Sequence, residues 1–148
     1  MAVNAYWYGK GLIAALNKEI DWDTDTIKVA LATSGYSPNQ DTHDYWNDVS
    51  ACEVIGTGYT ASGVTASAKT ANYTAGTNEA WWDADDVSWA NSTIPDARYA
   101  IVYDASGGAA SLNALIAYVD FGQTFATNNG TFLIQWSASG IVRITASA

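Results

Sequence analysis

Three groups of residues in this chain have the types and spacing that chemistry requires, and the first is a run of carboxylates at alternate positions: Asp21, Asp23 and Asp25. Hard cations such as Ca²⁺ take oxygen ligands at such a spacing. A calcium loop, however, needs glycine at its sixth position and glutamate at its twelfth, where this chain has Thr26 and Ala32. A solvated turn with Trp22 packed beneath it is therefore the favoured interpretation, and the sequence leaves open whether the carboxylates bind a cation.

The second group pairs the single histidine, His43, with the single cysteine, Cys52. A cysteine beside a histidine base can act as a nucleophile. His43 lies in a polar stretch between Asp41 and Asp44, which is typical of a solvated side chain. A lone cysteine in a strand is typically a small buried hydrophobe. We therefore predict no catalytic dyad here.

The third group places tryptophans beside carboxylates: Trp81, Trp82 and Trp89 with Asp83, Asp85 and Asp86. Such a set can form a carbohydrate cleft, and a glycosidase needs two carboxylates about 5–10 Å apart that flank a sugar. Carboxylates so close together on one turn do not face each other, so we expect no enzyme. The favoured interpretation is a two-strand unit in which Trp82, Ala84, Val87 and Trp89 face the core while Trp81 and Asp83 face outward. A sugar-binding patch on Trp81 and Trp82 remains an alternative.

Composition excludes several classes of function. The chain has 148 residues, a formal net charge of −9 and only six lysines and arginines, so it lacks the basic footprint that nucleic-acid binding requires. One cysteine excludes an internal disulfide. No apolar run approaches the ~18 residues of a membrane span, and no basic and then apolar leader is present, so we expect synthesis in the cytoplasm and no membrane partner. No cofactor is predicted.

The elements that must position these residues are mainly strands. Four strand-length segments between residues 97 and 146 are rich in β-branched and aromatic residues and are separated by Gly, Asn, Asp and Ser: Ala97–Tyr103, Asn113–Phe121, Thr131–Trp136 and Ile141–Ala146. Short connections predict an antiparallel meander. The second segment is apolar on both faces and should be a central strand covered on both sides. In the third, Phe132, Ile134 and Trp136 share the buried face.

The chain before these segments predicts one helix and further short strands. Leu12, Ile13, Leu16 and Ile20 fall on one helical face, and the helix should begin near Gly11. Strands are expected at residues 26–34, with Ile27, Val29 and Leu31 inward, at 52–55 and at 64–70. Residues 35–56 should form a long surface connection with a short helical turn near Asp44–Asp48. Together these segments predict an all-β fold, an antiparallel β-sandwich or jelly-roll-like barrel of about eight strands with one short N-terminal helix.

Residues 1–20 are expected to form an N-terminal arm and short helix packed on a single β domain of residues 21–148. Within the arm, Tyr6, Trp7 and Tyr8 precede Gly9 and Gly11, which loosen the helix start. We therefore expect the three aromatics to form a detachable arm that anchors an interface with another subunit, and Trp81 and Trp82 are further candidate interface residues. Deleting residues 2–8 should then weaken association at least tenfold and change the melting point of the isolated subunit only slightly.

Nearly the whole chain resembles a family of small tailed-phage virion proteins. The likeness lies in the opening residues 5–49, AYWYGKGLIAALNKEIDWDTDTIKVALATSGYSPNQDTHDYWNDV, and in GTGYTASGVT, DADDVSWANSTI, ARYAIVYD, LIAYVDFG and FLIQWSASGI. It implies a structural role in the virion, as a capsid decoration or cement subunit that binds the lattice of the major capsid protein and itself forms a dimer or trimer. A tail or fibre component is the alternative within this class, and a carbohydrate-binding module is the alternative outside it. The resemblance carries over no functional residues.

Overall fold

The computed structural model describes residues 2–3 and 5–147, and its all-β character confirms the predicted class. One α-helix, α1, spans Gly9–Leu16, and two 3-10 turns, η1 and η2, span Trp46–Asp48 and Ser50–Cys52. The strands are β1 Ala2–Val3, β2 Tyr6–Trp7, β3 Ile27–Ala32, β4 Val64–Thr65, β5 Thr70–Thr74, β6 Glu79–Asp83, β7 Val87–Ser92, β8 Ala97–Asp104, β9 Leu115–Phe125, β10 Gly130–Trp136 and β11 Val142–Thr145.

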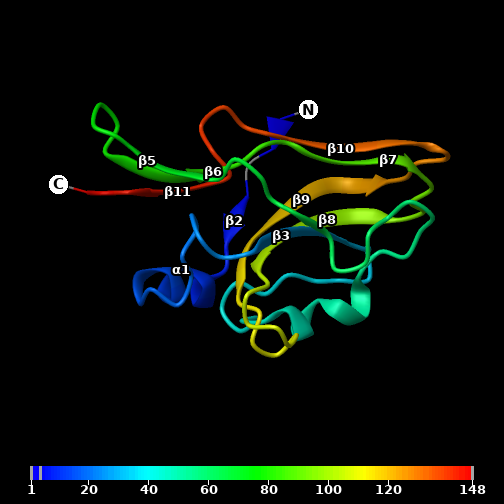
Figure 1. The fold of residues 1–148 in the computed structure, drawn as a ribbon, viewed down its shortest axis with the longest axis horizontal. Coiled ribbons are helices and arrows are strands. Elements are labelled where there is room, and N and C mark those ends of the chain that lie inside the picture. Colours follow the sequence, from blue (N-terminus) through cyan, green and yellow to red (C-terminus); the bar gives the residue numbers. More distant parts are fainter. Residues whose placement is uncertain (1, 4, 148) are drawn as a thin grey trace.

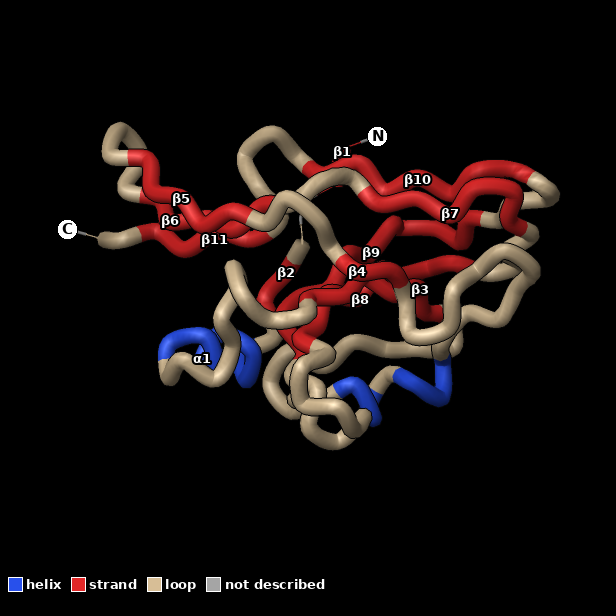
Figure 2. The backbone as a smooth tube through the Cα atoms, viewed as in Figure 1, coloured by secondary structure: helices blue, strands red, loops and turns tan. Residues whose placement is uncertain are grey.

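The strands form three sheets in a sandwich-like arrangement (Figures 1 and 2). A five-stranded sheet in the order β2-β9-β8-β3-β4 makes one layer, and a three-stranded sheet β1-β10-β7 lies over it. The third sheet, β11-β6-β5, extends beyond the body of the sandwich on the side of α1 (Figure 1). We call this third sheet the projecting sheet.

The main hydrophobic core lies between the two layers of the sandwich. Alternate residues of β10 face inward as predicted, with Phe132, Ile134 and Trp136 buried and Leu133 exposed. They meet side chains of the five-stranded sheet such as Val102 in one continuous cluster. Fully burying a side chain of this size contributes about 1.5–3 kcal/mol, so this cluster is the main source of stability.

A second core covers the opposite face of the five-stranded sheet. Residues 33–56 run across that face and contribute Trp46, whose ring stacks on Tyr103 with centroids 4.4 Å apart and planes 11° apart. Tyr8 and Leu115 belong to the same cluster and are fully buried. Because both faces of the sheet are covered, β3, β8 and β9 are apolar on both faces, as the sequence predicted for the strand at residues 113–121.

The predicted four-strand meander is wrong. Only β8 and β9 pair with each other, whereas β10 pairs with β7 and β11 pairs with β6. The predicted unit of residues 81–89 is likewise divided, because β6 belongs to the projecting sheet and β7 to the sandwich. Strand length and turn composition are local properties, but the partner of a strand is set by which faces bury apolar area together.

The predicted helix face is wrong for Ile13 and Leu16, although Leu12 is half-buried and Ile20, beyond the end of α1, is buried in the main core. Ile13 and Leu16 are 53% and 67% exposed, and the buried helical residues are Gly11 and Ala14. A Cβ on Gly11 would collide with the carbonyl oxygen of Leu115, so the helix lies against β9 through a glycine. The helix therefore packs on β9 through Gly11 and not through its larger apolar side chains.

Two short predicted strands differ from the structure. Residues 52–55 form only an isolated bridge, between Ala32 and Glu53. The strand expected at residues 64–70 is divided into β4 and β5, which belong to different sheets. The turn predicted near residues 44–48 is present as η1, in which Asp48 accepts a hydrogen bond from the backbone N–H of Asp44 at 2.9 Å.

The N-terminal segment is woven into the β domain. β1 pairs in parallel with β10, and β2 pairs with β9, so the segment contributes to both layers. Across residues 2–3 and 5–147, no helix has the length and apolar character needed to cross a membrane.

Candidate functional site

The two faces of the projecting sheet differ in chemistry. Side chains of directly paired residues lie on the same face. Register therefore gathers one set on the face toward α1: Ala71, Tyr73, Ala80, Trp82, Val142 and Ile144. The other face carries polar and charged side chains together with one tryptophan: Asn72, Trp81, Arg143 and Glu79. One face of this sheet is thus apolar although only its inner end is covered by the main core.

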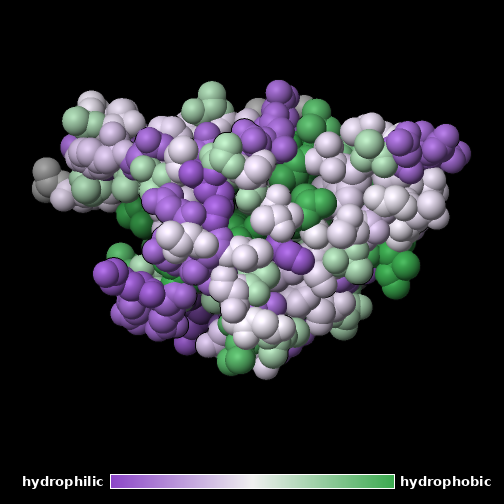
Figure 3. Space-filling model, in the orientation of Figure 1, coloured by the Kyte–Doolittle hydropathy of each residue, from purple (hydrophilic) through white to green (hydrophobic). Residues whose placement is uncertain are grey.

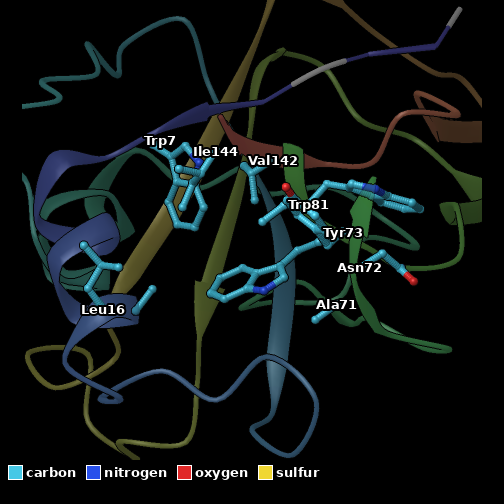
Figure 4. Close-up of a pocket in the computed structure, with 11 residues that line it drawn as sticks. Trp7, Leu16, Ala71, Asn72, Tyr73, Trp81, Val142 and Ile144 are labelled. Atoms are coloured by element: carbon cyan, nitrogen blue, oxygen red, sulfur yellow. The ribbon is translucent and has the colours of Figure 1, made fainter. Parts of the chain in front are cut away.

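An open groove lies between that apolar face and the helix. It has a volume of about 370 Å³ and is lined by β5, β6, β11, β2 and the end of α1 (Figure 4). Leu16 and Tyr73, on opposite sides, are 67% and 58% exposed, and Ile144 is 39% exposed. Apolar atoms show in the recess between the projecting sheet and α1 in Figure 3. We call this recess the aromatic groove.

Three tryptophans pack against one another at the aromatic groove, and we call them the tryptophan ladder: Trp7 and Trp82 line the groove, whereas Trp22 is 2% exposed and is buried against Trp82. Trp82 stacks on Trp22 with centroids 5.0 Å apart and planes 11° apart, and the centroid of the Trp7 ring lies 5.2 Å from that of Trp82 with the two planes 58° apart. The indole N–H of Trp22 donates to the carbonyl of Asp83, and that of Trp7 donates to the carbonyl of Arg143, both at 3.1 Å. Because the indole N–H of Trp7 is satisfied within the fold, its ring offers apolar surface to the groove, at an angle to the ring of Trp82.

Trp81 and Trp82 do not form a joint platform. Adjacent residues of a strand point to opposite faces, and Trp81 lies on the polar face, where its indole N–H donates to the hydroxyl of Thr74 at 3.1 Å. The turn at Gly140 closes over the Trp81 ring. A sugar that stacks on one ring therefore cannot also stack on the other.

The three predicted N-terminal interface residues occupy three different environments. Tyr6 is 57% exposed and its ring lies 5.6 Å from Tyr118. Trp7 is half-buried and lines the aromatic groove. Tyr8 is fully buried in the second core, and its hydroxyl hydrogen-bonds that of Tyr36 at 2.8 Å. In this conformation Tyr8 is not available to a partner, which does not fit the expectation of a detachable aromatic arm.

The carboxylates beside the tryptophans hold the connection between β6 and β7. Asp85 accepts a hydrogen bond from the hydroxyl of Ser67 at 3.0 Å, and Asp86 accepts one from the backbone N–H of Trp136 at 2.8 Å. Burial raises the pKa of Asp83, and the neighbouring carboxylates of Asp86 and Asp85 raise it further. Asp85 and Asp86 are therefore structural acceptors, whereas the buried Oδ1 of Asp83 has no hydrogen-bond partner within the described residues.

The alternating aspartates form a turn closed by their own side chains. Asp21 accepts hydrogen bonds from the backbone N–H groups of Asp23 and Thr24, and Asp25 accepts one from the N–H of Asp21 at 2.7 Å. The hydrogen bond with the Thr24 side chain, together with these backbone bonds, lowers the pKa of Asp21. Trp22 is buried beneath the turn as predicted. The described part of the chain contains no group of three or more His, Cys, Asp or Glu side chains arranged to hold a metal ion.

His43 is not the solvated side chain that the sequence predicted. It is half-buried, and its Nδ1 hydrogen-bonds the hydroxyl of Tyr36 at 2.8 Å, which extends the chain of hydrogen bonds from Tyr8. Burial raises the pKa of Tyr36 to about 12, so this hydroxyl stays protonated at neutral pH. Cys52 is half-buried and packs against the second core. Both residues thus contribute to packing beneath the five-stranded sheet.

A second recess of about 330 Å³ lies at the β9–β10 end of the sandwich. Its apolar lining includes Val3, Phe121, Phe125 and Leu133, of which Leu133 is 57% exposed. None of the predicted site residues lines it. The aromatic groove, in contrast, contains Trp7 and Trp82 from that set and remains the stronger candidate.

Sequence reasoning missed several groove residues. Leu16 was assigned to the helix core, and Tyr73, Val142 and Ile144 were not singled out at all. The available signal was the alternation Val142, Ile144 against Arg143, Thr145, which predicts one apolar and one polar face for β11. The alternation does not show that the apolar face of β11 stays uncovered, because that results from the projecting sheet extending beyond the body of the sandwich.

No protein-family model, no curated protein and no solved structure matches this chain.

Proposed function

We propose that this chain is a phage virion structural protein, a decoration subunit that binds the lattice of the major capsid protein and stabilises the head. The observation that carries the proposal is the uncovered apolar face of the projecting sheet, whose groove side offers Tyr73 and Ile144 to solvent opposite Leu16 of the helix. Contiguous apolar surface with a polar rim marks protein-binding sites. The resemblance to small tailed-phage virion proteins supports the choice of partner.

The physical form of the aromatic groove favours a protein partner over a small substrate. Its wall is an apolar sheet face and Trp7 and Trp82 form its floor, while the nearby carboxylates Asp85 and Asp86 are held by Ser67 and Trp136. Aromatic residues at the centre of an interface contribute about 2 kcal/mol or more each when a partner covers them. We assign the groove to the contact with the coat-protein lattice.

Quantitative mass spectrometry of purified particles tests the proposal. A decoration subunit should be present at a copy number close to that of the coat protein. A few copies per particle would replace this proposal with the tail or fibre alternative. Absence from the particle would overturn a virion role altogether.

A pair of matched variants tests the assignment of the groove. Leu16 and Leu112 are exposed to similar extents, 67% and 61%, but Leu112 lies in the β8–β9 connection, outside the groove. Leu16→Asn should weaken binding to particles at least tenfold, because it puts an amide where apolar contact forms. Leu112→Asn should bind as the unmodified chain does. Equal binding by both variants would remove the groove from the coat-protein contact.

A further inference from the structure

We infer that the outer edge of β5 pairs with β5 of a second copy, antiparallel and about a two-fold axis at Asn72. Two three-stranded projecting sheets then join into one continuous sheet of six strands. The inference deepens the proposed function by naming the self-association surface, and it rests on that function only for its setting on a virion. The pairing itself is a property of the isolated chain.

β5 is an open edge. It is the end strand of the order β11-β6-β5, and all five of its residues, Thr70–Thr74, are exposed. Within residues 2–3 and 5–147, neither a strand nor an isolated bridge pairs with its outer side. An open edge presents a row of unpaired N–H and C=O groups, which is a template for another strand.

The opposite edge of the projecting sheet is already occupied. The backbone N–H of Ala5 donates to the carbonyl of Ile141, and the indole N–H of Trp7 donates to that of Arg143, both at 3.1 Å. β5 has no such cover, and its sequence, TANYT, contains neither a charged residue nor a proline. Charges and prolines are the usual devices that keep an edge strand from pairing. Their absence distinguishes β5 from a protected edge.

The sequence of β5 is complementary to itself. About a two-fold axis at Asn72, Ala71 lies opposite Tyr73 of the second copy on the groove side, so a small side chain meets a large one. On the other side, Thr70 lies opposite Thr74 of the second copy, and the two Asn72 amides meet on the axis. Thr–Thr pairs and amide pairs directly opposite each other are favourable in antiparallel sheets. No like charges meet, although the whole chain carries −9.

The pairing places two aromatic grooves on one face of the joined sheet. Ala71 and Tyr73 belong to the apolar face, so this face runs through the axis from one groove to the next. Five residues of strand pairing are small beside the ~800 Å² per partner of a stable interface, so the dimer in solution should be weak. On a lattice, two grooves joined in this way bind with avidity, which strengthens both contacts.

Charge substitution on the axis tests the pairing. In Asn72→Lys two ammonium groups face each other across the axis, and in Asn72→Asp two carboxylates do, so each variant alone should stay monomeric. An equimolar mixture places a lysine opposite an aspartate and should form the mixed dimer. Asn128→Lys and Asn128→Asp are matched controls, because Asn128 is exposed in the connection between β9 and β10, which lies at the other end of the molecule (Figure 1).

Sedimentation velocity at low ionic strength, from about 1 μM to 1 mM, provides the readout. The unmodified chain and both Asn128 variants should shift from monomer to dimer across this range. If the unmodified chain is monomeric at every concentration, the inference is overturned. The same result is expected if the true partner of β5 is a strand of another protein. Undiminished association of Asn72→Lys also overturns the inference, and a mixture that fails to associate refutes the axis at Asn72. The particle copy number is a separate measurement, so failure of the pairing and failure of the virion role are distinguishable.

Discussion

Replacing Tyr8 by alanine should destabilise the isolated chain far more than replacing Tyr6, two residues earlier. Tyr8 is fully buried, its ring lies 5.2 Å from that of Tyr118, and its hydroxyl bonds Tyr36 at 2.8 Å. Truncating a buried aromatic side chain to alanine costs about 3–5 kcal/mol, because contacts are lost and a cavity remains. Tyr6 is 57% exposed, so its truncation should cost less than about 1 kcal/mol.

A third variant separates the ring from its hydroxyl. Tyr8→Phe keeps the ring in place, and Tyr36 keeps its hydrogen bond to His43, so the expected cost is only about 1 kcal/mol. Deleting residues 2–8 removes the whole buried side chain as well as β1 and β2. The deletion should therefore unfold or strongly destabilise the subunit, contrary to the slight effect expected from the sequence.

Guanidinium unfolding curves measure the three free energies, provided that the slope against denaturant stays unchanged. For a chain of 148 residues, 1 kcal/mol corresponds to roughly 2–4 °C in melting temperature, so Tyr8→Ala should lower it by roughly 6–20 °C. If Tyr8→Ala lowered the free energy of unfolding as little as Tyr6→Ala does, the burial of the Tyr8 side chain would be refuted. The segment would then be the detachable arm that its sequence suggested.

Three further predictions concern stability. Gly11→Ala should lower the free energy of unfolding by about 1–3 kcal/mol, because the new Cβ meets the carbonyl of Leu115 and this outweighs the better helix propensity of alanine. An unchanged or raised free energy of unfolding would show that α1 can move away from β9. Trp82→Ala should cost about 2 kcal/mol or more by removing the middle ring of the tryptophan ladder, whereas Tyr73→Ala, 58% exposed on the same face, should cost less than about 0.5 kcal/mol; equal effects would contradict the ladder. Burial raises the pKa of Asp104, so its native form binds protons more tightly than its unfolded form, and this group's contribution to stability falls as pH rises through the raised pKa. Asp104→Asn should therefore stabilise the fold at pH 7 and lose that advantage below the ordinary aspartate pKa. If the free energy of unfolding changed with pH in the same way for the variant and the unmodified chain, this prediction would be wrong.

Local signals in the sequence predicted local structure well. The alternation of Phe132, Ile134 and Trp136 identified the buried face of β10, because the two-residue period of a strand requires no knowledge of its partner. The turn above Trp22 was likewise predictable from the carboxylates that cap its backbone N–H groups. These features depend on neighbours within a few residues.

Features that depend on distant partners were not predictable from the sequence. The residues from β9 to β11 contain no sequence signal that assigns the two strands to different sheets. The prediction that Ile13 and Leu16 are buried was wrong for a related reason, since the contact between Gly11 and β9 leaves both side chains outside the core. The aromatic groove exists because of both effects together, so only the alternation along β11 hinted at it.

Of the predicted interface residues, Trp7 and Trp82 lie at the aromatic groove, and Tyr6 is exposed nearby on β2. Trp81 lies on the opposite face of the projecting sheet and Tyr8 lies in the core. An aromatic cluster read from the sequence therefore combined surface and core residues, since strand alternation sends neighbours in opposite directions.

The structure of the assembled particle at side-chain resolution tests the central claim most directly. We predict that the apolar face of the projecting sheet, with Leu16 across the groove, is covered by coat protein and that β5 is paired with β5 of a neighbouring copy. Particles in which the aromatic groove opens to solvent in every copy, while another surface of the subunit meets the lattice, would contradict it.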